Sequence, residues 1–392
     1  MGRLSASGPG AMMRDHAIRE RPSTPLELLF DLCFVVAVAA LAGELHHGLG
    51  AGHAVEASLA YGLIFVPIWW AWMSYTWFAT AFSHDDTVTR LLTFAQMGGI
   101  LAVSAAVPSA FEGHVVPFAL TYSVMRVPLI VQWLRSAAAD SAHRGFALTY
   151  AAGSTLAQVL WVAGALVGGR VGAGVLVGAL GVELATPMLA VRRSPDRVFH
   201  PRHIAERYGL FTLIVLGESI LAVTSGLLPV VEGRAPVVGG IVIVGCALVV
   251  AAAVWWAYFG TLGTDALERH RRAAFLWGYG HYVVFAAVAA IGAGIRAVID
   301  SLTLSTHPAP AGTVVTAAAA ALAMLALGGL ARTADAGIGT TPPFVSAAVL
   351  AATALAAPAL GPFIALPVTA LTLVAVAVTT GRVNRPHRDR TD

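Results

Sequence analysis

HIAERYGLFTLIVLGESILAVT, residues 203–224, places a carboxylate in the middle of an apolar run. The stretch opens with His203, Glu206 and Arg207, continues in apolar residues, and carries Glu218 near the centre of its apolar part. A soluble helix can turn such a residue to water, whereas a membrane helix must give it a partner or a water-filled cavity. The solvent around the chain therefore decides how Glu218 is interpreted.

The composition indicates a membrane protein. Of the 392 residues, 57% are hydrophobic and 11% are charged, against about 25% charged in an ordinary soluble domain. Apolar runs of about 20 residues recur along the chain, and each is long enough to cross a bilayer. The runs lack polar alternation, so they predict helices and not a barrel. The expected fold class is all-α, a polytopic transmembrane helical bundle.

Twelve spans are expected, and the arginines orient them. Twenty of the 24 arginines fall in the two tails and the even-numbered loops, whereas the odd-numbered loops hold Arg170 and Arg234. This bias predicts that both termini are cytoplasmic. The expected spans are 27–46, 55–77, 91–111, 115–134, 146–168, 171–191, 208–228, 237–260, 274–298, 312–331, 343–358 and 361–381.

The two halves of the chain resemble each other. Trp69-Trp70-Ala71-Trp72 in the second span is matched by Trp255-Trp256-Ala257-Tyr258 in the eighth, and Arg90 by Arg272. Six spans repeated in the same orientation predict a parallel six-plus-six repeat. The predicted organisation is a cytoplasmic tail 1–26, a first half 27–191, a basic cytoplasmic linker 192–207, a second half 208–381 and a cytoplasmic tail 382–392.

Two motifs carry a family resemblance. E-L-x-F-D-L-x-F-V at Glu27–Val35 and H-x-A-E-R-Y-G-L-F-T-L-I-V-L-G-E-S at His203–Ser219 are similar to those of the bacterial low temperature requirement protein A family. Cys33 stands where an aliphatic residue is expected. The resemblance covers essentially the whole chain and implies a multi-pass protein of the bacterial inner (plasma) membrane, associated with growth in the cold. It implies no established biochemical activity.

The first span opens with two carboxylates. Glu27 and Asp31 are four residues apart and share one face of the expected helix. Glu27 has two readings, a cap at the helix start or a member of a cytoplasmic charge cluster with His203, Glu206 and Arg207. Asp31 lies deeper and is expected either to pair with an arginine of the 192–207 segment or to bind a cation or proton.

Further ionisable residues lie inside spans. Arg126 in the fourth span could pair with Glu183 in the sixth or with Glu218 in the seventh, forming a structural clamp between helices. The alternative is a protonatable or cation-binding site, because burial favours a neutral acid unless a cation is close. His281 could extend a proton relay through Glu218 and Gln96, or it could be a hydrogen-bonded interhelical histidine.

No motif predicts an enzyme, a cofactor or a metal site. The chain lacks a Walker A loop, a G-x-S-x-G elbow, H-E-x-x-H and C-x-x-C. Ser83-His84-Asp85-Asp86 is interpreted as a loop that caps the next helix. The glycine pairs Gly168/Gly172 and Gly174/Gly178 are interpreted as helix-packing positions. Arginine-rich cytoplasmic loops are enough to explain the sequence pI of about 9.1. Nucleic-acid binding is therefore not expected.

The favoured functional hypothesis is a proton- or cation-coupled transporter or permease. Its first alternative is a cation channel, because Phe30-Asp31 in a first helix and two six-span repeats are similar to the lysosomal potassium channel family. The second alternative is a structural or lipid-interacting membrane protein. Expected partners are the lipid bilayer and a proton, cation or small-molecule substrate, with a homo-oligomer left open. The candidate polar core is Asp31, Arg126, Glu183, Glu206, Arg207, Glu218 and His281.

Overall fold

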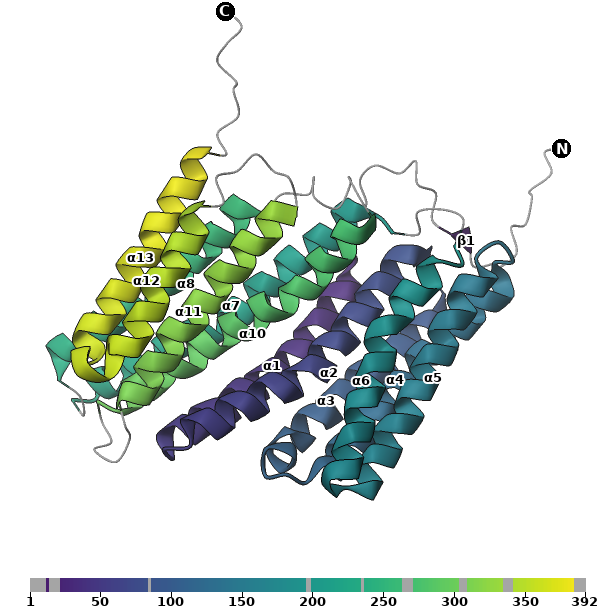
Figure 1. Cartoon of the computed structure of the whole chain (residues 1–392), viewed down its shortest axis with the longest axis horizontal. Coiled ribbons are helices and arrows are strands. Elements are labelled where there is room, and N and C mark those ends of the chain that lie inside the picture. The colour runs from purple at the N-terminus through teal and green to yellow at the C-terminus, as the bar shows by residue number, and fades with distance from the viewer. Residues whose placement is uncertain are drawn as a thin grey trace, which may run out of the picture. The chain divides into compact units, whose positions relative to one another are not determined.

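The computed structural model is all-helical apart from one two-residue strand pair (Figure 1). It describes residues 12–13, 22–83, 86–194, 199–233, 236–262, 271–302, 309–333 and 341–383. The strands β1 (Met12–Met13) and β2 (Phe82–Ser83) pair antiparallel. Because the pair is so short, the fold class remains all-α.

Twelve helices within the described residues are long and apolar enough to cross a membrane. Each matches one of the twelve expected spans, which confirms the polytopic helical fold. Their bounds are α1 Pro25–Gly50, α2 Ala54–Ala81, α3 Thr87–Phe111, α4 Val115–Ala139, α5 Arg144–Val167, α6 Gly169–Val191, α7 Pro201–Val231, α8 Val237–Thr261, α10 Arg271–Asp300, α11 Ala309–Thr333, α12 Thr341–Leu360 and α13 Pro362–Val383.

Helix α7 begins seven residues before the expected span. Pro201 is its first residue, a position at which the fixed φ of proline suits a helix and its missing N–H costs nothing. The sequence-based span began where the charges stop, but a helix can extend beyond the membrane into water. His203, Glu206 and Arg207 are therefore helical residues, and not part of an irregular linker.

The chain divides into two compact units. Unit 1 comprises residues 1–37 and 67–204, and unit 2 comprises residues 38–66 and 205–392. Helices α1, α2 and α7 each pass from one unit to the other along their length.

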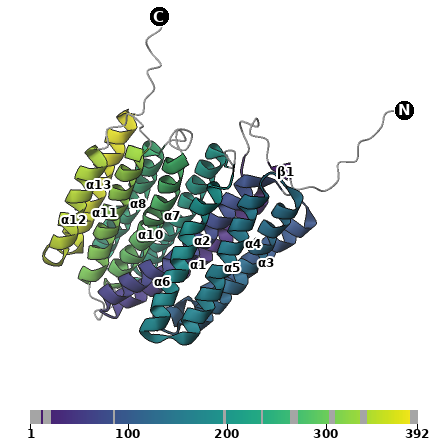
Figure 2. The same cartoon turned by 45° about the vertical axis from the view of Figure 1, so that its right-hand side comes forward.

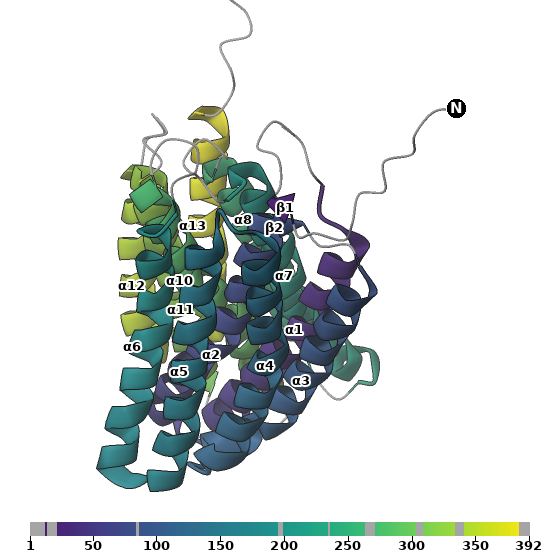
Figure 3. The same cartoon turned by 90° about the vertical axis from the view of Figure 1, so that its right-hand side faces the viewer.

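In unit 1, helices α3, α4, α5 and α6 pack in sequence order, each against the next (Figure 3). Aromatic side chains fill the space between α2, α4 and α5. The Trp133 ring stacks on Tyr150 at a centroid distance of 4.1 Å, and Phe78 meets Trp133 edge-on at 4.8 Å. Stacked and edge-on aromatic pairs stabilise such packing beyond the area they bury.

In unit 2, α10, α11, α12 and α13 also pack in sequence order, and α8 packs on α13 (Figure 2). Helices α10 to α13 thus pack on one another in the same sequence order as helices α3 to α6, and a six-plus-six repeat requires this. The repeat and the cytoplasmic location of the termini remain predictions. Large apolar side chains such as Leu63, Val171 and Leu355 are exposed, which is typical of helices whose outer faces contact lipid.

Most of the glycines predicted to allow close helix packing do not do so, and other glycines take that role. A Cβ on Gly172 would collide with the carbonyl oxygen of Gly164, so this glycine does serve packing, whereas Gly174 and Gly178 face open space. A close crossing in unit 2 joins α10 and α11. A Cβ on Gly312 would lie 2.7 Å from the Gly294 carbonyl oxygen, so only glycine fits this contact.

Candidate membrane-buried polar sites

Arg126 and Glu183 form a buried ion pair in unit 1. Arg126 on α4 is 2% exposed and Glu183 on α6 is 1% exposed. The Arg126 Nε atom lies 3.7 Å from Glu183 Oε1. The sequence left Glu183 and Glu218 open as partners of Arg126. The structure shows that Arg126 pairs with Glu183. The two opposite charges compensate each other in a region from which water is excluded.

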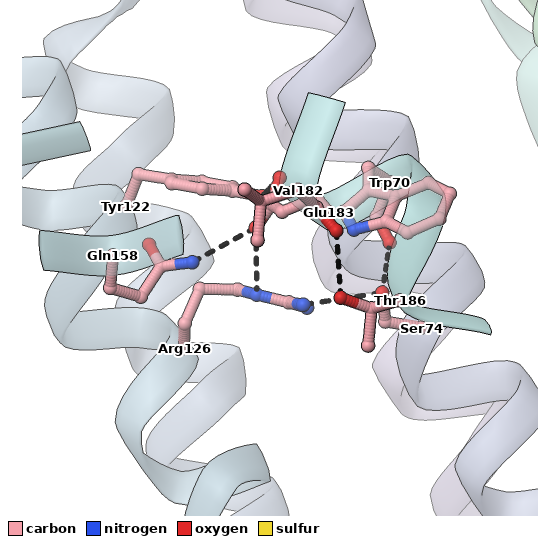
Figure 4. Close-up of polar contacts among 8 residues, drawn as sticks. All are labelled: Trp70, Ser74, Tyr122, Arg126, Gln158, Val182, Glu183 and Thr186. Atoms are coloured by element: carbon pink, nitrogen blue, oxygen red, sulfur yellow. Dashed lines mark hydrogen bonds and ion pairs between the residues drawn. The ribbon is translucent and has the colours of Figure 1, made fainter. Parts of the chain in front are cut away.

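Neutral donors complete the surroundings of Glu183 (Figure 4). The Tyr122 hydroxyl lies 3.1 and 3.0 Å from the two carboxylate oxygens, and Gln158 Nε2 donates to Oε1 at 2.9 Å. Arg126 Nη2 donates to Ser74 Oγ on α2 at 3.2 Å. This Glu183 clamp, made by Ser74, Tyr122, Arg126, Gln158 and Glu183, joins helices α2, α4, α5 and α6.

The neutral members of the clamp were not predicted from the sequence. Tyr122, Gln158 and Ser74 interrupt apolar runs in three different spans, and that interruption is the signal that could have identified them. A single polar residue per span does not reveal which partner it meets. With several hydrogen bonds on one carboxylate, the arrangement is suited to holding four helices together.

Asp31 is fully buried in unit 1. Its Oδ1 atom accepts a hydrogen bond from Trp72 Nε1 at 2.7 Å. The neighbouring Phe30 ring stacks on Tyr75 at 3.9 Å. The indole of Trp72 is therefore one partner of Asp31.

Glu27 closes a capping box at the start of α1. Its Oε2 accepts hydrogen bonds from the Thr24 backbone N–H at 2.7 Å and from the Thr24 hydroxyl at 3.0 Å, while its own N–H donates to Thr24 Oγ1 at 3.3 Å. Reciprocal bonds of this kind satisfy the free N–H groups of a helix start. The capping role expected for Glu27 is confirmed, and His203 Nε2 lies 3.4 Å from the same oxygen.

The expected cytoplasmic charge cluster is not a surface feature as a whole. His203 is 3% exposed and Arg207 is completely buried, whereas Glu206 is exposed. His203 and Arg207 are four residues apart in α7 and therefore share one face of the helix. His203 and Arg207 are therefore buried members of the expected cluster, and the cytoplasmic location of the cluster remains a prediction.

His281 is a hydrogen-bonded histidine in the core of unit 2. Its Nδ1 donates to the Trp277 carbonyl oxygen at 2.7 Å, and its Nε2 lies 3.0 Å from the Tyr258 hydroxyl. Gln96 in unit 1 instead donates to Gln132 Oε1 at 3.1 Å. The hydrogen bonds of His281 and Gln96 are those of structural side chains, and the relay remains a prediction.

Glu218 differs from Glu183 because it is only half-buried. Its side chain lies against Gly292 of α10, where a Cβ would come within 3.1 Å of Glu218 Cγ. Arg296 and His46 are close enough to interact with it electrostatically. His46 Nε2 also lies 2.7 Å from Asp300 Oδ2. In unit 2, two basic side chains, Arg296 and His46, thus lie with two carboxylates, Glu218 and Asp300, around this part of α7 and α10.

The histidines, cysteines and acidic residues that the structure describes form no metal centre. Among the described residues, no group of three or more His, Cys, Asp and Glu side chains could hold a metal ion. His46 contacts Asp300, whereas His47 and His53 are exposed. His84 and Asp85 lie outside the described residues. Cys33 and Cys246 are free thiols.

Asp86 is the cap of α3, as the sequence predicted. Its Oδ1 accepts from the Thr89 N–H at 2.7 Å, and its Oδ2 accepts from Arg135 Nη2 at 2.8 Å. Partial burial by itself raises the pKa of Asp86, but the hydrogen bonds from Arg135 and Thr89 outweigh it and lower the pKa from 3.8 to about 2. The cap thereby ties the start of α3 to the end of α4.

This depressed pKa predicts a pH dependence. Because the folded pKa lies below the unfolded value, the stabilisation by Asp86 is complete above about pH 4 and is lost as the pH falls towards about 2. Asp86→Asn keeps a cap but loses the ion pair. We expect wild type to have the higher thermal unfolding midpoint at pH 6 and the difference to vanish near pH 2. A difference that is constant with pH would contradict the assignment.

The comparisons with known proteins agree with the motifs in α1 and α7. The model of the bacterial low temperature requirement A protein family, LtrA, matches residues 22–378. The chain belongs to this family. A protein of Rhizobium meliloti (strain 1021) described as "Uncharacterized protein RA0937" is 27% identical over 299 residues, which are 71% of this chain and 70% of the relative. The LtrA match begins before α1, ends within α13, and includes the Glu183 clamp and Glu218.

Proposed function

We propose that this LtrA-family membrane protein is a proton- or cation-coupled transporter of the bacterial inner membrane, and that Glu218 binds the coupling ion. The observation that carries the proposal is the half-buried position of Glu218 in a membrane-spanning helix. A carboxylate at such a depth is costly and marks ion pathways and proton relays in membrane proteins. Transport, and not catalysis, is the activity proposed.

The contrast with Glu183 supports this choice. Glu183 accepts hydrogen bonds from Tyr122 and Gln158 and faces Arg126, so its charge is held by fixed partners. Within the described part of the chain, no hydrogen-bond donor contacts the Glu218 carboxylate. Arg296 and His46 act on it only through their charges. A carboxylate without fixed donors can exchange a proton or cation with little rearrangement.

Glu218→Gln tests the proposal, because glutamine has the same shape and cannot exchange a proton or attract a cation. The protein is reconstituted in liposomes with a pH-sensitive dye, and gradients of protons, cations and small metabolites are imposed. Wild type should give saturable coupled flux, and Glu218→Gln should reduce it to the level of empty liposomes. Glu206→Gln is the matched control, since Glu206 is an exposed carboxylate of the same helix.

A structural or lipid-interacting role is the second candidate, and the Glu183 clamp is the observation that favours it. If no ion or metabolite gives flux, or if Glu218→Gln changes stability alone, the transport proposal fails and this candidate is preferred. Conductive flux that does not saturate would instead indicate a cation channel. The bilayer is the partner common to all three functions.

A further inference from the structure

A chain of hydrogen bonds joins the starts of α1 and α7 to α2 within unit 1. The Glu27 carboxylate, fixed by its capping box with Thr24, faces His203 Nε2 at 3.4 Å. On the other side of the ring, His203 Nδ1 lies 2.9 Å from the hydroxyl oxygen of Thr80. That hydroxyl is in turn 2.9 Å from the carbonyl oxygen of Thr76. Glu27 and His203 are each 3% exposed, and Thr80 is completely buried.

With Glu27 ionised, counting protons along this chain gives two complete arrangements. A hydroxyl has one proton but can also accept, so Thr80 can donate either to the Thr76 carbonyl or to His203 Nδ1. If it donates to Thr76, then Nδ1 must carry a proton and donate to Thr80. If it donates to Nδ1, then that nitrogen carries none. In both arrangements Nε2 carries a proton and faces Glu27, because a carboxylate only accepts.

The two arrangements differ by one proton on His203 and by the rotation of one hydroxyl. In the first the ring is an imidazolium beside an ionised Glu27, and in the second it is neutral. Neither leaves a ring nitrogen without a partner, and a buried nitrogen left unpaired would cost the desolvation free energy of that group. An ordinary buried histidine, with partners fixed for one charge state, resists the change.

We propose that His203, with Glu27 as counter-charge and Thr80 as a switchable partner, is a reversible proton-binding site. The ligand of this site is a single proton. When His203 binds it, the proton adds to Nδ1 and the Thr80 hydroxyl turns from the ring to the Thr76 carbonyl. When His203 releases it, the hydroxyl turns back and Nε2 keeps its own proton.

The charged groups near the site fix the expected direction of variants. Among the described residues, the titratable side chain that contacts His203 is Glu27 of α1. The negative charge of Glu27 favours the imidazolium form of His203. Asp31 lies one turn further along α1 and is buried against Trp72. On α7 itself, Arg202 and Glu206 are exposed and Arg207 is buried. Removing the charge of Glu27 should therefore make His203 release its proton at a lower pH.

The use of this site in transport rests on the proposed function. The starts of α1 and α7 are predicted to lie at the cytoplasmic side, where a proton-coupled transporter must exchange protons with the cell interior. Proton binding by His203 can nevertheless be measured without any flux. The site and the transport proposal can thus fail separately.

Solid-state ¹⁵N NMR of the protein in lipid bilayers tests the site. The chain has 13 histidines, so the His203 signals are assigned by their loss in His203→Gln. We expect both ring nitrogens to carry protons at low pH and only Nε2 to do so at high pH, within a range of about pH 4 to 9. A ring that keeps one protonation state across this range, or a neutral ring protonated on Nδ1, would overturn the proposal.

Two variants, one of them with a matched control, test the partners. Glu27→Gln keeps a residue that can complete the capping box but removes the charge, and should lower the pH of His203 titration by about one unit. Thr80→Val leaves the imidazolium Nδ1–H without an acceptor and should also lower it, whereas Thr80→Ser keeps the hydroxyl and should match wild type. Titration unchanged in both Glu27→Gln and Thr80→Val would refute the roles assigned to these residues.

Liposome flux separates this site from the transport function. If His203 titrates as expected and no substrate gives flux, the proton site stands and the proposed function fails. The opposite outcome is also possible: wild type transports, His203 does not titrate, and His203→Gln leaves the pH dependence of flux unchanged. In that case the proton site is wrong and the transport proposal stands.

Discussion

Arg126→Met should destabilise the protein by about 3–5 kcal/mol, because it leaves Glu183 buried without its cation. Tyr122 and Gln158 would still donate to the carboxylate, but neutral donors do not supply an opposite charge. Methionine has a similar length and fills the space, so loss of packing contributes little. The free energy of unfolding, measured by steric trapping in bicelles, is the quantity to compare.

The double variant Arg126→Met/Glu183→Leu distinguishes the lost charge pairing from a general sensitivity of the site. With both charges removed, no charge remains uncompensated, and the double variant should be more stable than Arg126→Met alone. Arg170→Met is the control, since Arg170 lies exposed near the start of α6, and its change should stay within about 0.5 kcal/mol. A single variant as stable as wild type would show that the ion pair contributes nothing.

Gly294→Ala should destabilise unit 2 by about 1–3 kcal/mol, as over-packing of a closely packed core does. The new Cβ would lie 2.5 Å from Thr316 Oγ1 and 2.9 Å from both the Gly312 carbonyl oxygen and the Thr316 backbone nitrogen. Two of these three atoms belong to the backbone of α11, so the clash cannot be relieved by rotating a side chain. Helices α10 and α11 would have to move apart.

Gly245→Ala is the matched control for this prediction. Gly245 also lies within a helix of unit 2, but a Cβ there meets nothing within 4 Å. Alanine is the better helix former, so this variant should equal or exceed wild type in stability. Thermal unfolding in detergent, followed by tryptophan fluorescence, compares the two. If both variants behaved alike, the close approach of α10 and α11 would not be the cause.

The twelve spans could be predicted because membrane insertion is decided locally. A run of about 20 apolar residues must form a helix that satisfies its own backbone, and nothing distant in the chain changes that requirement. The capping roles of Glu27 and Asp86 were predictable for the same reason, since a cap contacts residues within its own first turn. The start of α7 was misplaced because charged residues end the membrane span without ending the helix.

The partners of the buried polar residues were not predictable to the same degree. Arg126 had two candidate acids in the sequence, and the packing of α4, α5 and α6 brought it to Glu183. The same packing added Tyr122 and Gln158, which sequence analysis had not considered. The burial of His203 and Arg207 likewise depends on which face of α7 turns inward, and residue type alone suggests a water-exposed cluster there.

The sequence by itself determined the solvent, the helices, their number and the family, because each follows from local composition or from a contiguous motif. Only the tertiary structure decided that Glu183 is held by fixed partners, that Glu218 is half-buried, and that His203 lies between Glu27 and Thr80. Those properties depend on atoms that are far apart in the chain and meet when helices pack. The apolar pattern sets where a helix crosses the membrane, and packing sets which face of it reaches a partner.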